Sequence, residues 1–152
     1  MERLLVAAVL VAVAVVVAVV VDRRSRRDAP TQGRWAVPAQ VDRADFAAPT
    51  SPWLVVVFSS ATCTTCAAAV AAARAVEGGD VAVDDVEHVA RRDLHDRYAI
   101  DAVPTVLVVD DEGVVRASFV GAPDADELRE AIADVEAGKP RTETQVRLPK
   151  RR

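Results

Sequence analysis

Aromatic residues, lysine and asparagine are scarce in this sequence. Aromatic residues make up 4% of its 152 residues, asparagine is absent, and 2 lysines stand beside 17 arginines. The shortage of lysine and asparagine indicates a GC-rich genome rather than a function. The shortage of aromatic residues contrasts with an apolar content of 51%. The apolar residues are therefore not those of an ordinary globular core alone.

Positive charge is lacking in the central part of the chain. The formal net charge is −4, but residues 29–137 alone carry −11, because basic residues collect at the two ends. A surface that binds nucleic acid needs clustered lysine and arginine. The charge distribution therefore excludes such a surface on the central domain, and no nucleic-acid partner is expected.

The apolar excess lies in an unbroken run of 18 residues at 4–21. As a helix rising about 1.5 Å per residue, the run would reach roughly 27 Å, close to the thickness of the hydrocarbon core of a bilayer. It is longer than the usual apolar region of a signal peptide and passes directly into Asp22-Arg23-Arg24, without the small residues of a cleavage site. The sequence predicts a transmembrane anchor at 4–21, with a cleaved signal peptide as the alternative.

The arginines beside this run predict the side of the membrane. Arg3 precedes the run, whereas four arginines follow it between positions 23 and 27. Because basic residues near a span favour the cytoplasm, we expect a single-pass protein of the cell membrane with a cytoplasmic domain. An extracytoplasmic domain is the alternative. The six basic residues of 138–152 fit the inner leaflet, which attracts basic segments, and they equally fit a disordered, solubilising end.

The rest of the chain divides into a linker, one domain and a tail. We expect a basic juxtamembrane linker at 22–34, a domain at 35–137 and a basic, disordered tail at 138–152. Within the domain, the apolar pattern predicts strands at 53–58, 81–83, 105–109 and 114–120, and helices at 67–76, 87–98 and 125–135. This order is typical of an α/β fold with a mixed sheet.

Both cysteines fall in one motif, Cys63-Thr64-Thr65-Cys66, between the first predicted strand and the helix that follows. Unpaired backbone N–H groups at a helix start stabilise a thiolate and lower the pKa of a thiol placed there. Cys66 lies one helical turn beyond Cys63, close enough to attack a mixed disulfide formed at Cys63. The motif predicts that Cys63 is the nucleophile and Cys66 the resolving thiol.

Two other uses of the cysteines fit the sequence less well. A zinc site would have to recruit His88 and His95, whose separation by six residues lies outside the usual spacing. A static disulfide is uncommon in a reducing cytosol. The two histidines lie in a charged stretch and are expected to be solvated surface residues. No cofactor motif is visible, so neither a metal nor a cofactor is expected.

Residues 53–135 resemble the thioredoxin family. The resemblance rests on an apolar strand before the Cys-x-x-Cys motif, on Val103-Pro104-Thr105 before a hairpin, and on Val120-Gly121 before the last helix. With the apolar N-terminal run, the chain is similar to the membrane-tethered thioredoxin-like proteins of GC-rich bacteria. The resemblance implies a thioredoxin-like sandwich behind one N-terminal transmembrane helix.

The resemblance also implies a set of site residues. Cys63 and Cys66 would be the redox-active pair, and Pro104 would be held in cis beside them. Val103 would offer its backbone to an extended substrate segment, and Gly121 would let that partner approach closely. The expected partners are proteins that carry disulfides, together with a protein or small thiol that supplies electrons.

The chain departs from the thioredoxin pattern around the cysteines. Thr64-Thr65 replaces Gly-Pro, Thr62 and Ser59 replace aromatic residues, and Val57 replaces a buried acid that takes the proton of the resolving thiol. We therefore expect a weak or specialised thiol–disulfide oxidoreductase held at the membrane. The alternative is a redox-inert thioredoxin-like module that holds a membrane partner.

Overall fold

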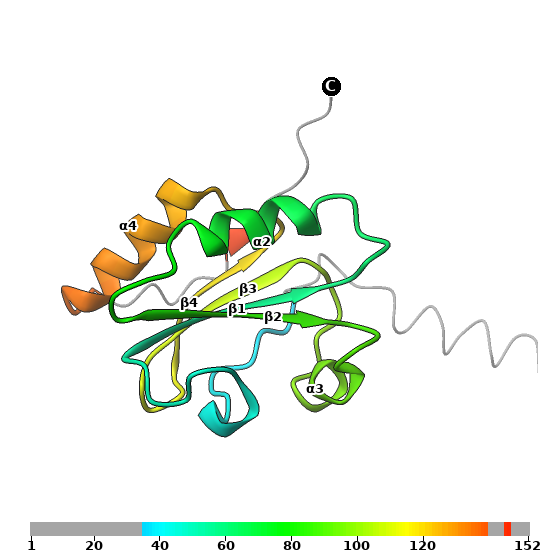
Figure 1. Ribbon diagram of the computed structural model, residues 1–152, viewed down its shortest axis with the longest axis horizontal. Coiled ribbons are helices and arrows are strands. Elements are labelled where there is room, and N and C mark those ends of the chain that lie inside the picture. Colours follow the sequence, from blue (N-terminus) through cyan, green and yellow to red (C-terminus); the bar gives the residue numbers. More distant parts are fainter. Residues whose placement is uncertain (1–34, 140–144, 147–152) are drawn as a thin grey trace, which may run out of the picture. The chain divides into compact units, whose positions relative to one another are not determined.

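The computed structural model describes residues 35–139 and 145–146, which form a five-stranded mixed sheet with helices on both faces (Figure 1). The strands are β1 Trp53–Ser59, β2 Val81–Glu87, β3 Thr105–Val109, β4 Val115–Val120 and β5 Gln145–Val146. The helices are the 3-10 turn η1 Arg43–Asp45, then α2 Cys66–Arg74, α3 Arg92–Arg97 and α4 Ala125–Glu136.

Strand β1 lies inside the sheet, whose order is β2-β1-β3-β4-β5. It pairs in parallel with β2 and antiparallel with β3. β4 pairs antiparallel with β3 and in parallel with β5. Every residue of β1 after Trp53 is buried, which explains its continuous apolar sequence, since an inner strand covered on both faces has no polar side.

Two cores flank the sheet. Helices α2 and α4 cover one face, and α3 with the segment 35–52 covers the other (Figure 1). Val55 and Val57 of β1 belong to the first core, together with Ala69 of α2. Leu54 and Phe58 belong to the second core. Successive residues of a strand face opposite sides of a sheet, so β1 supplies both cores by simple alternation.

The expected α/β order with a mixed sheet is confirmed, but one of the predicted helices is wrong. The stretch 87–98, expected as a helix, begins with the end of β2 at Glu87, and only Arg92–Arg97 is helical. Val89, expected on an apolar helix face, is 80% exposed. The charged residues Asp84 and Asp85 lie within β2, so the strand lacks the apolar run that would have shown its length.

The shorter helix also corrects the expectation that both histidines are solvated. His95 is 3% exposed, because α3 turns it towards the sheet beside Leu94. Its Nε2 lies 2.9 Å from the carbonyl oxygen of Val86, and its ring meets the ring of Phe58 edge-on at 5.1 Å. His88 is half-buried, and its ring lies 4.9 Å from that of His95.

The segment 35–52 is fastened to the β3–β4 hairpin. The N–H of Val41 donates to the carbonyl of Gly113 at 2.8 Å, and the N–H of Val115 donates to the carbonyl of Ala39 at 3.0 Å. Phe46, which is 4% exposed, packs into the second core. This segment is therefore part of the domain.

In the part of the chain that the structure describes, no helix is both long and apolar enough to cross a membrane. The anchor predicted at 4–21 and the linker predicted at 22–34 lie outside that part. So does most of the predicted tail, of which residues 138, 139 and 145–146 are described. These expectations remain predictions.

Candidate functional site

The two cysteines lie where β1 passes into α2, and a disulfide joins them with their Cα atoms 5.4 Å apart. Helix α2 begins at Cys66 rather than at Cys63. Cys63 lies in the preceding turn, where its N–H donates to the carbonyl of Ser60 at 3.1 Å. The nucleophile expected at the helix start therefore stands just before it, and only the resolving cysteine belongs to the helix.

The two cysteines differ in exposure. Cys66 is 3% exposed, whereas Cys63 is half-buried. A substrate disulfide can therefore approach Cys63, and Cys66 is reached only from within the domain. This asymmetry fits a nucleophile that meets the substrate and a second thiol that acts after it.

The start of α2 favours negative charge on Cys63. Thr65 is the N-cap residue, and its side chain makes no capping hydrogen bond. The first N–H groups of the helix are therefore left without a side-chain cap and can stabilise an anion. The hydroxyl of Thr65 lies 3.6 Å from the Sγ of Cys63 and can donate to a thiolate there. The sequence analysis assigned Thr65 no role.

The loop before β3 lies against the cysteine pair. The Val103–Pro104 peptide bond is cis, and the Sγ of Cys63 lies 3.8 Å from the carbonyl oxygen of Val103. In the disulfide this sulfur carries no proton, so the approach is a contact, and the reduced thiol can donate to the same oxygen. Pro104 is buried and Val103 is half-buried, which leaves the Val103 edge accessible to a partner.

Gly121 completes this corner of the domain. Its N–H donates to the carbonyl of Pro104 at 2.8 Å, and its φ of 105° lies in the region that favours glycine. The structure thus links Gly121 to Pro104 by a hydrogen bond and Val103 to Cys63 by a contact. All five residues singled out from the sequence lie in one region, while the substrate-binding roles of Val103, Pro104 and Gly121 remain predictions.

Glu87, at the end of β2, holds the loop before the cysteines. Its carboxylate accepts from the N–H groups of Ala61 at 3.2 Å, Val89 at 2.8 Å and Ala90 at 2.9 Å. The hydrogen bond from Ala90 has the largest effect on the pKa of Glu87, which these bonds hold below its ordinary value against the effect of desolvation. Sequence reasoning missed this contact because it placed Glu87 in a helix.

A polar contact joins the carboxyl ends of β1 and β2. The hydroxyl of Ser59, which is 4% exposed, donates to the Oδ1 of Asp85 at 2.6 Å. Val57 lies opposite Asp85 in the register of β1 and β2 and is buried in the first core. The carboxylate on this face of the sheet therefore comes from β2 and not from β1.

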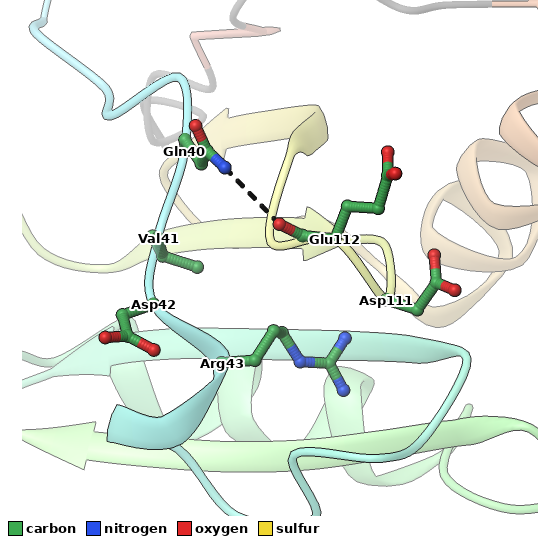
Figure 2. Close-up of a pocket in the computed structure, with 6 residues that line it drawn as sticks. All are labelled: Gln40, Val41, Asp42, Arg43, Asp111 and Glu112. Carbon is green, nitrogen blue, oxygen red and sulfur yellow. Dashed lines mark hydrogen bonds between the residues drawn. The ribbon is translucent and has the colours of Figure 1, made fainter.

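A surface pocket of about 520 Å³ lies at the other end of the sheet, beside the β3–β4 turn (Figure 2). It is lined by Gln40, Val41, Asp42, Arg43, Asp111 and Glu112. Gln40 spans it, donating from Nε2 to the carbonyl of Glu112 at 3.4 Å. Because β1 and β3 run antiparallel, this turn lies away from the cysteines. Among the described residues, no group of three or more His, Cys, Asp or Glu side chains could hold a metal ion.

Comparison with known proteins agrees with this geometry. The family model described as Thioredoxin matches residues 40–134. A mutant thioredoxin from Halobacterium salinarum NRC-1 has 23% sequence identity and a TM-score of 0.53, covering 64% of this chain and 86% of its own. A malarial protein reaches 14% identity and a TM-score of 0.50, over 54% of this chain and 94% of its own. At these identities, the two structures show the fold alone. No curated protein matches the chain.

Proposed function

The chain belongs to the thioredoxin family, and we propose that it is a membrane-anchored thiol–disulfide oxidoreductase that exchanges electrons with disulfides of other proteins. The observation that carries the proposal is the disulfide between half-buried Cys63 and buried Cys66. A pair that closes on itself at the start of a helix, with one sulfur accessible, is suited to alternate between dithiol and disulfide.

The proposed reaction proceeds in two exchanges. The thiolate of Cys63 attacks one sulfur of the substrate disulfide, forms a mixed disulfide and releases the first substrate thiolate, which takes a proton from water. The thiolate of Cys66 then attacks the Sγ of Cys63, closes the internal disulfide and releases the second substrate thiolate. Two electrons pass from the cysteine pair to the substrate, and the reverse sequence oxidises a substrate dithiol.

The substrate would lie along Val103. A segment in extended conformation that pairs with this backbone needs no particular sequence, and the contact between Val103 and Cys63 would bring its disulfide to the nucleophile. The half-buried Gly121 has no side chain to obstruct it. Electrons would come from another protein or a small thiol, since this reaction uses no bound cofactor.

Membrane attachment is the part of the proposal that rests on the sequence alone. The apolar run at 4–21 and the arginines after it support an anchor with the domain at the inner face. A chain lacking residues 4–21 should lose its association with membranes. After treatment of intact cells with an impermeant reductant, an impermeant maleimide should still leave Cys63 unlabelled, and labelling would place the domain outside.

Trapping of substrates tests the exchange reaction. Replacing Cys66 by serine removes the resolving thiol, so Cys63 should accumulate in mixed disulfides with cellular proteins. These adducts should disappear on reduction and in the matched control with both Cys63→Ser and Cys66→Ser. The alternative is a redox-inert binding module, which is favoured by Val57 at the position where thioredoxins carry a buried acid. It would give no adducts and no reduction of a model disulfide, and that result would contradict the proposal.

A further inference from the structure

Closure of the internal disulfide requires Cys66 to lose its proton, because the thiolate and not the thiol is the nucleophile. Cys66 is 3% exposed, so solvent water has little access to it. A group inside the domain must therefore accept the proton while a substrate covers Cys63. The following inference identifies that group and rests on the function proposed above.

The elements around Cys66 offer few proton acceptors. Strand β1 presents Val57 and Ser59 to the face that α2 covers, and β1 contains no ionisable residue. In α2 the only charged side chain is Arg74, at the far end of the helix from Cys66, where it forms an ion pair with Glu77 at 2.9 Å. Neither β1 nor α2 supplies a base.

Strand β2 supplies one. It runs parallel to β1 with Val57 opposite Asp85 and Ser59 opposite Glu87. Val83 belongs to the first core, and by the alternation of a strand Asp85 lies on that same face. The face is the one that α2 covers, and the carboxyl end of β1 and β2 is the end where α2 begins. Asp85 therefore lies on the side and at the end of the sheet where Cys66 is found.

Glu87 shares this face but is already engaged. Its carboxylate accepts from the N–H groups of Ala61, Val89 and Ala90. These bonds stabilise its charged form, which makes it a poor proton acceptor. Asp85, by contrast, accepts from a hydroxyl that can itself carry a proton onward.

Four further titratable side chains near the carboxyl end of β2 lie on its opposite face. Asp84 is bound by Arg91 at 2.8 Å. His95 packs against that face with its Nε2 at the carbonyl of Val86, and the ring of His88 packs against His95. The sheet separates all four side chains from the side that carries Cys66.

We propose that Ser59 and Asp85 form a proton relay for Cys66. The hydroxyl hydrogen of Ser59 is committed to Asp85, which leaves the lone pairs of its Oγ free to accept. The thiol proton of Cys66 passes to Ser59, directly or through one water molecule, while the hydroxyl proton of Ser59 passes to the Asp85 carboxylate. The Cys66 thiolate then forms the disulfide with Cys63 and releases the substrate thiolate.

The relay returns to its starting state without another reactant. Asp85 is half-buried, so it can release the proton to solvent, where the departing thiolate is protonated. Because Asp85 acts through Ser59, it is a positioning residue for the resolution step. It has no part in the first attack by Cys63, and this separation makes the relay testable.

A two-phase thiol assay on the purified full chain separates the steps. The reduced protein is mixed with one equivalent of 5,5′-dithiobis(2-nitrobenzoic acid), and the released thionitrobenzoate is followed by stopped flow. The first phase reports attack by Cys63 and the second reports closure by Cys66. Asp85→Asn should leave the first phase unchanged and slow the second at pH 7 by about 100-fold, the lower end of general-base effects. Ser59→Ala should also slow the second phase.

The pH profile distinguishes a relay from a structural role. Rising pH supplies hydroxide, which can take the proton in place of the relay, so the second phase of Asp85→Asn should accelerate with pH towards that of the unchanged chain. If Asp85→Asn instead slowed closure by displacing Cys66, its second phase would stay slow at every pH. Asp84→Asn removes the same charge from the opposite face of β2 and should leave the second phase of the assay unchanged.

Two results would overturn different claims. Absence of the first phase in the unchanged chain contradicts the oxidoreductase proposal itself. A normal first phase, followed by equal second phases in the unchanged chain and in Ser59→Ala, overturns the relay and leaves the oxidoreductase standing. Ser59→Ala removes only a hydroxyl, so it decides the matter if circular dichroism shows that Asp85→Asn does not fold.

Discussion

Replacing Arg43 by methionine should lower the free energy of unfolding by about 3 kcal/mol, although Arg43 lies at the end of the sheet away from the cysteines. Its guanidinium donates to the carbonyls of Asp110 at 2.6 Å, Ser51 at 2.7 Å and Ala48 at 3.2 Å. The side chain thus ties the segment after η1 to the end of β3. Methionine keeps the apolar stem and loses all three bonds.

The magnitude follows from two opposing effects. A hydrogen bond to a charged group contributes roughly 1.5–3 kcal/mol, and two of the three bonds of Arg43 are short. Against this stands the cost of burying a guanidinium that is 8% exposed and whose Nε has no partner. Burial lowers the pKa of Arg43, and the charges of Asp111 and Asp110 only partly oppose that effect. The net loss is about 3 kcal/mol, since each buried carbonyl left without its donor costs roughly 1–3 kcal/mol, and the guanidinium no longer has to be desolvated.

Urea unfolding followed by circular dichroism measures this loss. For a domain of this size, each kcal/mol lowers the melting temperature by roughly 4–8 °C, so a thermal scan gives an independent value. Arg92→Met is the matched control, because Arg92 and Asp96 are each 73% exposed and lie 3.8 Å apart, and such pairs contribute little. Equal stability of the two variants would refute the argument that the three carbonyls hold the segment through Arg43.

Two further predictions concern the turn near Arg43 and the loop near the cysteines. Gly113→Ala should destabilise the domain by about 2–3 kcal/mol, because Gly113 has a φ of 83° and an added Cβ would collide with the carbonyl of Val41. Gly79→Ala, at a φ of 55° with open space around it, should cost about 1 kcal/mol, and equal urea midpoints would contradict this difference. Because the pKa of Glu87 is lowered, chiefly by the N–H of Ala90, its contribution to stability is complete above its unfolded pKa, about 4.3. The contribution is lost as the pH falls through the lower folded pKa. Glu87→Gln should therefore lose less stability than the unchanged chain between pH 5 and 3. Parallel curves of stability against pH over that range would contradict this prediction.

The fold was predictable where the sequence signals are local. The apolar run of β1 and the strand β3 at Thr105–Val109 were found directly. So was α4, whose apolar face recurs at helical spacing. Its start is further explained by a reciprocal capping box between Asp124 and Glu127. Each of these patterns lies within a dozen residues and needs no knowledge of the partner elements.

The parts that were missed depend on contacts between distant residues. The second half of β2 carries acidic residues whose partners lie outside the strand, Ser59 for Asp85 and Arg91 for Asp84, so the sequence predicted only 81–83 as a strand. The same reason hid Glu87 from the site, because its bond to Ala61 exists only once β1 and β2 are paired. The cysteines were found because their motif is contiguous.

The position of β2 has a consequence for self-association. Among the described strands, β2 pairs only with β1. Beyond the bridge from Val81 to Gly78 and the hydrogen bond from Arg74 to the carbonyl of Val83, its outer edge can template another strand. A second copy that added β2 to β2 would bring the carboxylates of Asp85 and Glu87 together in an already acidic domain. Like charges on neighbouring strands oppose pairing. The acidic residues that obscured the second half of β2 in the sequence therefore also protect this edge against aggregation.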